Sequence, residues 1–195
     1  MTRTRKRPSS PAAERATPDR LLDAAAAEFQ AHGYFATDTN RIARRAGFAP
    51  QTFYRHFPDK LAAFIAVYAR WSAAESEAVR RAASAAENRA AAAAGALLAF
   101  HRDWAVFRRS LRLLAVDDDR VRQARADSRS RQIAALAGLP RNAGRSRADL
   151  LAALLAVERL CDAAADGEPA DLAVPEAAWR RAVTAAVAAA RGEAG

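Results

Sequence analysis

Residues 37–61 read TDTNRIARRAGFAPQTFYRHFPDKL and contain the signals of two short helices joined by a tight turn. Thr37 can cap the first of these helices, which carries the apolar residues Ile42 and Ala43. Gly47 ends that helix, because glycine reaches left-handed backbone angles without a steric cost. The pattern therefore predicts a helix that is followed at once by a turn.

A second short helix begins near Pro50, since proline suits a first helical turn. It carries Phe53 and Phe57, and Pro58 ends it. Asp59 then starts a long helix, in keeping with the preference for acidic residues at helix N-termini. Two short helices around a glycine turn are typical of a helix-turn-helix.

The chain before this stretch supplies a further helix and a basic tail. Thr17 is a suitable N-cap, Pro18 suits the first helical position, and Gly33 can end the helix in a left-handed conformation. Residues 1–16 are basic and rich in proline and serine, so we expect them to bury nothing and to be disordered. Such a tail either follows the phosphates of DNA or only keeps the chain soluble.

The three predicted helices have an apolar side and a polar side. Five apolar residues can form a compact core: Phe29, Ile42, Phe48, Phe53 and Phe57. The side chains left to face outward are Gln51, Thr52, Tyr54, Arg55 and His56. Their amide, guanidinium and hydroxyl groups are of the kinds that bond to base edges and phosphates. Periodicity alone leaves an ordinary helical bundle as the alternative.

The composition of the whole chain favours an all-α protein with a polyanionic partner. The 195 residues include only 8 Gly and 8 Pro, and alanine supplies much of the 51% hydrophobic content. The formal net charge is +9, and basic residues are denser in the first 60 residues than in the rest. A run of about 18 apolar residues and a secretory signal are both missing, so we expect a cytoplasmic protein without a membrane partner.

Motifs of enzymes and of metal sites are also missing from the sequence. The single cysteine excludes an internal disulfide and a cysteine-rich zinc site. His32, His56 and His101 lack the spacing of metal ligands, and the acidic run 117–119 is better explained as the start of a helix. Neither a nucleophile elbow nor a glycine-rich phosphate loop is present. We therefore expect no catalysis, no metal and no cofactor.

The helical pattern continues after residue 62 to the end of the chain. Two apolar stripes near the C-terminus predict a dimer surface, formed by Leu151, Leu154, Leu155, Trp179, Val183 and Val187. Alanines between these residues allow two helices of each chain to approach closely in a four-helix bundle. The alternative is that the stripes are buried within the monomer.

Aromatic residues gather in the middle of this second region, where many of their neighbours are alanines. The candidate residues of a ligand pocket are Phe64, Tyr68, Trp71, Phe100, His101, Trp104, Phe107 and Cys161. Small alanines beside bulky rings can leave room for a hydrophobic or aromatic small molecule. The alternative is that each of these residues is ordinary core.

The run from Thr17 to Leu61 resembles the DNA-binding domain of the TetR/AcrR family of transcriptional regulators. The matching pieces are Ala-Ala-Glu-Phe at 26–29, Gly33-Tyr34, Thr37, Ile42-Ala43, Ala46-Gly47 and the continuous segment TFYRHFPDKL at 52–61. The length of the chain and its helical remainder are also similar to that family.

The resemblance implies a set of DNA contacts, and the sequence departs from the family pattern at two positions. The residues implied to contact DNA are Thr37, Gln51, Thr52, Tyr54, Arg55, His56 and Lys60. By the resemblance, Thr37 caps the second helix near a phosphate, while Gln51, Thr52 and Arg55 lie in the major groove. Ala49 stands where the family often has Ser or Thr and cannot cap the recognition helix. Gln51 replaces a small residue, and its amide is the natural partner of adenine.

These observations predict a helix-turn-helix domain over 17–62 and a helical ligand-binding and dimerisation domain over 63–195. The predicted function is that of a ligand-responsive transcriptional regulator that acts as a repressor. It binds a palindromic operator as a homodimer and is released by a small hydrophobic or aromatic effector. Two alternatives stay open: a helical small-molecule-binding protein with vestigial DNA binding, and a basic protein that coats DNA without sequence preference.

Overall fold

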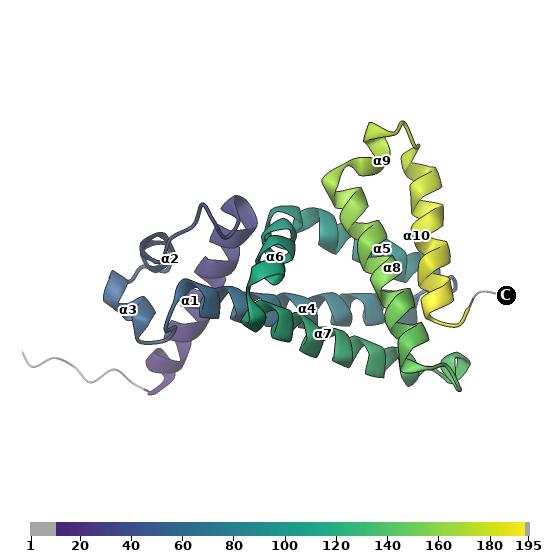
Figure 1. The fold of residues 1–195 in the computed structure, drawn as a ribbon. Helices are drawn as coiled ribbons and strands as arrows, with labels where there is room; N and C mark the ends of the chain where they lie inside the picture. Colours follow the sequence, from purple (N-terminus) through teal and green to yellow (C-terminus); the bar gives the residue numbers. More distant parts are fainter. Residues whose placement is uncertain (1–10, 194–195) are drawn as a thin grey trace, which may run out of the picture. The chain divides into compact units, whose positions relative to one another are not determined.

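The computed structural model describes residues 11–193, and the regular structure in that range is helical throughout (Figure 1). The elements are α1 (Pro11–His32), α2 (Thr39–Arg45), α3 (Pro50–Tyr54), α4 (Lys60–Ala85), α5 (Arg89–Asp103), α6 (Ala105–Asp117), α7 (Asp119–Ala137), η1 (Pro140–Asn142), α8 (Arg147–Asp166), α9 (Glu168–Asp171) and α10 (Glu176–Ala190). The predicted all-α class is confirmed.

The chain divides into two compact units, one that ends at Val67 and one that begins at Tyr68. This division lies inside α4, whereas the predicted boundary followed residue 62. The start of α4 belongs to the first unit because the ring of Phe64 packs edge-on against Phe29, with 5.1 Å between ring centroids, and against Tyr34 at 5.3 Å.

The core of the first unit consists of apolar side chains from α1 to α4. Its largest fully buried members are Leu21, Phe29, Ile42, Phe53 and Phe64. Burying a side chain of this size contributes about 1.5–3 kcal/mol. Two further residues of the predicted core, Phe48 and Phe57, are only half-buried. The guanidinium of Arg20 covers the Phe48 ring at 4.5 Å, and Phe57 rests against Phe53 at 5.5 Å.

The first helix begins earlier than predicted. It starts at Pro11 rather than at Thr17, and Pro18 lies inside it. The segment PAAERA over 11–16 opens with proline and is rich in alanine, a combination that favours helix initiation and growth. Of the predicted disordered tail, residues 11–16 therefore form helix, and residues 1–10 lie outside the described range.

Asp38, not Thr37, caps α2. The Asp38 carboxylate accepts a hydrogen bond of 2.8 Å from the backbone N–H of Arg41. Thr37 is buried, and its hydroxyl donates to the carbonyl of Gly33 at 2.8 Å. The predicted turn glycines are confirmed, because Gly33 and Gly47 have φ values of +74° and +76°.

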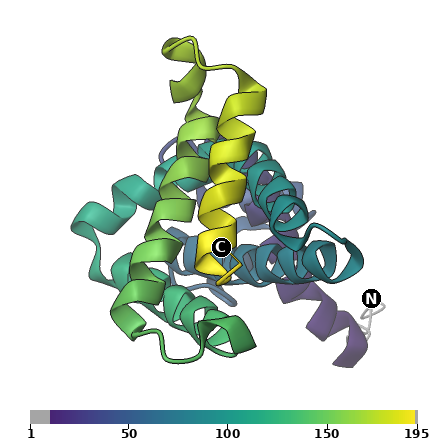
Figure 2. The same cartoon turned by 90° about the vertical axis from the view of Figure 1, so that its right-hand side faces the viewer.

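In the second unit, α5, α8 and α10 pack side by side, as both ribbon views show (Figures 1 and 2). Small side chains dominate their shared core, which contains Ala83, Ala90, Ala93, Ala94, Leu98, Val157, Cys161, Val183, Val187 and Ala190. Alanine at the contact lets helix axes approach toward the short end of the usual distance of about 8–10 Å. The alanine content of the sequence thus serves close helix packing.

Side chains cap the starts of several helices in this unit. Asp118 accepts hydrogen bonds from the N–H groups of residues 120 and 121 at the start of α7. Ser146 and Asp149 form a reciprocal capping box at the start of α8. The alanine-rich run 82–94 is interrupted, because α4 ends at Ala85 and Asn88 caps the next helix through the N–H of residue 91.

A buried ionic network crosses the second unit between α4, α5, α6 and α8. Asp162 receives two hydrogen bonds from the guanidinium of Arg108, at 2.7 and 3.1 Å. His101 lies between two carboxylates, with Nδ1 2.9 Å from Asp162 and Nε2 3.1 Å from Glu75. All four side chains are at least nine-tenths buried. Burial without such partners is strongly unfavourable for charged groups, so the four depend on one another.

The network also changes proton affinities. Burial alone raises the pKa of a carboxyl group, but hydrogen bonds from His101 and Arg108 hold the pKa of Asp162 well below its usual range. Burial disfavours the charged guanidinium of Arg108, and its hydrogen bonds with Asp162 reverse that effect and raise its pKa. Both groups are therefore charged at neutral pH.

We predict that Asp162→Asn lowers the free energy of unfolding by about 3–5 kcal/mol, because the buried guanidinium of Arg108 loses its counter-charge. Urea unfolding followed by circular dichroism at pH 7 measures this difference. Glu77→Gln is the control, since Glu77 forms an exposed ion pair with Arg80 and its loss is expected to cost far less stability. Equal losses in the two variants would contradict the prediction.

The pH dependence of this difference follows from the depressed pKa of Asp162. A carboxyl group whose folded pKa is below its unfolded value stabilises the fold fully above the unfolded value of about 4. The contribution is lost as the pH falls below that value. The gap in stability between wild type and Asp162→Asn is therefore expected to be constant from pH 5 to 7 and to narrow toward pH 3 (about one unit below the unfolded pKa).

Candidate nucleic-acid interface

The turn between α2 and α3 is closed by backbone hydrogen bonds and tied to α1. The N–H of Phe48 donates to the carbonyl of Ala43 at 2.9 Å, which brings the chain back toward α2. Arg20 on α1 donates to the carbonyl of Ala46 at 2.8 Å. A β-carbon at Gly47 would lie 3.1 Å from the Arg20 guanidinium. The turn is therefore fixed from both sides.

A buried carboxylate on α1 holds α2 in place. The oxygens of Glu28 lie 3.1 Å from Arg41 Nε and 3.1 Å from Arg45 Nη1. Glu28 is 5% exposed, whereas the two arginine side chains are about half exposed. Sequence analysis missed Glu28 and Arg20. The available signal was a single acidic residue next to Phe29 on the apolar face of α1, opposite an arginine-rich short helix.

The predicted recognition residues lie on one short segment and are open to solvent. Gln51 and Arg55 are exposed, and their side chains make no hydrogen bond or ion pair with any described residue. Tyr54 is 57% exposed, and its hydroxyl is 2.9 Å from that of Thr39 on α2. Thr52 and His56 are half-buried. The arrangement presents an amide and a guanidinium with all their hydrogen-bonding groups unused.

Two of the predicted DNA-contacting residues have other partners. The Thr37 hydroxyl donates to the carbonyl of Gly33. The Lys60 ammonium donates to the carbonyls of Tyr34 and Thr37, at 2.9 and 2.8 Å. The same ammonium lies 4.0 Å from the centre of the Tyr34 ring. Burial lowers the pKa of Lys60. Both residues thus fix the connection between α1 and α2, because the turn leaves carbonyls that need donors.

Most of the aromatic residues predicted to line a ligand pocket come together around Trp71. Trp71 is at the centre, about 6 Å from the rings of Tyr68 and His101 and 6.4 Å from those of Phe100 and Phe107. Trp104 joins the cluster through Phe107 at 5.5 Å. Phe64 belongs to the core of the first unit instead. The residues therefore form a packed aromatic core around the ionic network.

Cys161 is buried in the alanine-rich core. Burial raises the pKa of its thiol to about 12, which keeps it protonated and unreactive at neutral pH. Within the described residues, no group of three His, Cys, Asp or Glu side chains is placed to hold a metal ion. No described helix is long and apolar enough to cross a membrane.

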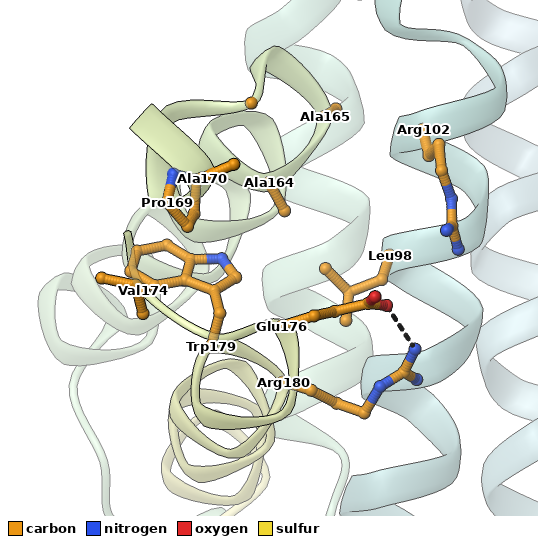
Figure 3. Close-up of a pocket in the computed structure, with 11 residues that line it drawn as sticks. Leu98, Arg102, Ala164, Ala165, Pro169, Ala170, Val174, Glu176, Trp179 and Arg180 are labelled. Carbon is orange, nitrogen blue, oxygen red and sulfur yellow. Dashed lines mark hydrogen bonds and ion pairs between the residues drawn. The ribbon is translucent and has the colours of Figure 1, made fainter. Parts of the chain in front are cut away.

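A cavity of about 300 Å³ lies elsewhere in the second unit, between α5, the end of α8, α9 and the start of α10 (Figure 3). Its apolar lining includes Leu98, Ala164, Pro169 and Trp179, and two arginines stand at its edge. None of the predicted pocket residues lines it. The signal that sequence analysis lacked is the left-handed Gly167, which turns the chain from α8 into α9 and opens this space.

The residues predicted for the dimer surface separate into two groups. Val183 and Val187 are buried in the monomer against α5 and α8, so they are unavailable to a second chain. Trp179 is half-buried, and its indole N–H donates to the carbonyl of Leu160 at 3.2 Å. Leu151 and Leu154 are partly exposed, and Leu155 is 39% exposed. For Val183 and Val187, burial within the monomer therefore applies.

Comparison with known proteins identifies the first unit and the fold. Residues 21–67 match the family model "Bacterial regulatory proteins, tetR family". No curated protein sequence matches the chain.

Three similar solved structures cover most of the chain. One, from Mesorhizobium loti, is described as a TetR-family transcriptional regulator; it is 20% identical, with a TM-score of 0.68 and coverage of 90% of this chain and 95% of that one. A second, described in the same terms, from Rhodococcus sp., is 16% identical, with a TM-score of 0.69 and coverage of 88% and 96%.

The third is the fatty acid degradation regulator FadR from Bacillus halodurans, 15% identical, with a TM-score of 0.62 and coverage of 94% and 96%. At these identities the likeness shows the fold, and the match over residues 21–67 shows the family of the first unit. The N-terminal unit is thus a TetR-family helix-turn-helix domain, and the chain has the fold of TetR-family transcriptional regulators.

Proposed function

We propose that this protein is a homodimeric, ligand-responsive transcriptional repressor that acts in the cytoplasm and is not an enzyme. The observation that carries the proposal is the free amide and guanidinium of Gln51 and Arg55, presented by a turn that Glu28 and Arg20 hold rigid. Rigid placement of unused donors and acceptors is what base recognition requires, because contacts to bases depend on orientation.

In the proposed complex, α3 lies in the major groove. Arg55 donates two hydrogen bonds to a guanine, and the Gln51 amide pairs with an adenine. Thr52 lies in the same groove, while Tyr54 and His56 bind phosphates, which fix the register without reading sequence.

A dimer is proposed because a single helix-turn-helix makes few contacts, and two copies on a palindrome multiply them. The exposed side of α8 carries Leu155 with small neighbours, and the outer side of α10 is rich in exposed alanines such as Ala182 and Ala185. Two such helices from each chain can form a four-helix bundle. Support for this surface comes from exposure and small side chains on adjacent helices.

The proposed effector is a small hydrophobic or aromatic molecule that binds the second unit. Binding in the aromatic core around Trp71 requires its rings to separate, because Trp71, Tyr68 and Phe107 are at least 95% buried. An effector with greater affinity for the separated arrangement would shift the population away from the DNA-binding state.

We predict that Arg55→Ala lowers the preference for an operator over the same operator with a changed guanine by about 1–3 kcal/mol, since it removes a bidentate base contact. Fluorescence anisotropy with operator DNA from upstream of the protein's own gene, and with the same DNA carrying the changed guanine, measures the preference. Random DNA of equal length measures nonspecific binding. Arg131→Ala, an exposed arginine on α7, is the control. An unchanged ratio would show that Arg55 reads no base, and equal binding of all DNA would favour nonspecific coating.

Lys60→Met tests whether this lysine acts on the turn or on DNA. We predict a loss of about 1–3 kcal/mol in unfolding free energy, because two carbonyls lose a charged donor. The slope of log Kd against log salt concentration is expected to fall by less than one. A fall of about one with unchanged stability would instead make Lys60 a phosphate contact.

Leu155→Asp is expected to yield monomers at low micromolar concentration, because it places a charge within the proposed bundle. Light scattering after size exclusion gives the mass directly. Leu113→Asp is the matched control, since Leu113 is 54% exposed but lies on α6. If Leu155→Asp remains a dimer, the interface lies elsewhere.

A further inference from the structure

The cavity at the α9 end of the second unit combines an apolar floor with a cationic edge. Leu98, Ala164 and Pro169 line it together with the indole of Trp179, and Arg102 and Arg180 stand beside them (Figure 3). The volume of about 300 Å³ is at the small end of the usual range for ligand sites. The cavity is open without any rearrangement, unlike the packed aromatic core around Trp71.

The two arginines are available to a ligand. Arg102 is exposed and makes no hydrogen bond or ion pair with any described residue. Arg180 donates to Glu176 only at 3.4 Å, and both of those side chains are at least half exposed. In Figure 3 the guanidinium of Arg102 points toward the Glu176–Arg180 pair. Two guanidinium groups against one carboxylate leave one positive charge unbalanced at this edge.

Trp179 provides a fixed apolar surface beside that charge. Its indole nitrogen is already used, because it donates to the carbonyl of Leu160 at 3.2 Å. Only ring carbon atoms are therefore left to meet a ligand. A fixed aromatic ring next to Leu98 and Pro169 favours an apolar body, and its contact area contributes binding free energy in proportion to the surface buried.

We propose that this cavity binds a small organic carboxylate with an apolar body, and that this compound is the effector of the proposed regulator. A guanidinium matches a carboxylate in two parallel hydrogen bonds. The carboxylate of Glu176 opposes a second negative charge, which favours a monoanion over a doubly charged phosphate monoester. The regulatory part of this proposal rests on the proposed function, whereas the binding part does not.

Isothermal titration calorimetry with the full-length protein tests the binding part. The probes are octanoate and benzoate, compared with 1-octanol, octylamine and octyl phosphate. Saturable binding is expected for the two carboxylates, with at least tenfold weaker binding of the alcohol, the amine and the phosphate. No saturable binding of either carboxylate, or equal binding of the alcohol, would overturn the proposal.

Variants then place the site. Arg102→Gln is expected to weaken octanoate binding about tenfold, which corresponds to the loss of one charged interaction of about 1.4 kcal/mol. Arg89→Gln, an exposed arginine at the start of the same helix, is the control and is expected to change nothing. Octanoate is also expected to quench tryptophan fluorescence in the wild type and not in Trp179→Phe. Unchanged affinity in Arg102→Gln together with quenching in Trp179→Phe would place binding elsewhere and overturn the assignment.

The regulatory part is measured separately, as release of bound operator DNA by octanoate in wild type and in Arg102→Gln. Release that needs about tenfold more octanoate in the variant supports the proposal. Binding to the cavity without any effect on DNA affinity would overturn the effector role alone. Failure of the protein to bind DNA at all would instead contradict the proposed function and leave the carboxylate site standing on its own calorimetry.

Discussion

The helices α2 and α3 are too short to hold their own shape, and the DNA-binding unit depends on the side chains that anchor them. They have 7 and 5 residues, whereas isolated helices of fewer than about 12 residues are marginal in water. Glu28 supplies one anchor through its two arginine partners on α2. Arg20 supplies another through the carbonyl of Ala46. Charged groups on α1 therefore set the direction in which Gln51 and Arg55 project.

In the second unit, too, charged side chains fix how the helices pack. An interface of alanines has little shape with which to distinguish one helix register from another. A bidentate pair such as Arg108 with Asp162 has a single favourable geometry. The pair joins α6 to α8, and His101 adds α5 to the same carboxylate. We infer that the buried charges set the register, while the alanines supply close contact.

Local chemistry was readable from the sequence, and contacts between distant residues were not. The turn at Gly47 and the capping box from Ser146 to Asp149 act within a few residues, so type and spacing predict them. Lys60 finds its carbonyl partners 23 and 26 residues away, and nothing in its neighbours reveals them. Val183 has the spacing of an interface residue but is covered by α5. The sequence predicts that the aromatic residues around Trp71 lie together. How closely their rings pack depends on tertiary structure.

In the proposed mechanism, regulation acts through α4, because this one helix contributes to both units. Its first residue, Lys60, closes the connection between α1 and α2, and Trp71 and Glu75 further along belong to the core of the second unit. A ligand alters DNA affinity only if it binds two arrangements of that core unequally. Occupation of the cavity at α9 can satisfy this condition through α5, since α5 carries both Arg102 at the cavity and His101 in the ionic network. The two residues are adjacent in sequence, so a carboxylate that draws Arg102 inward acts on the same helical turn that holds His101 between its two acids.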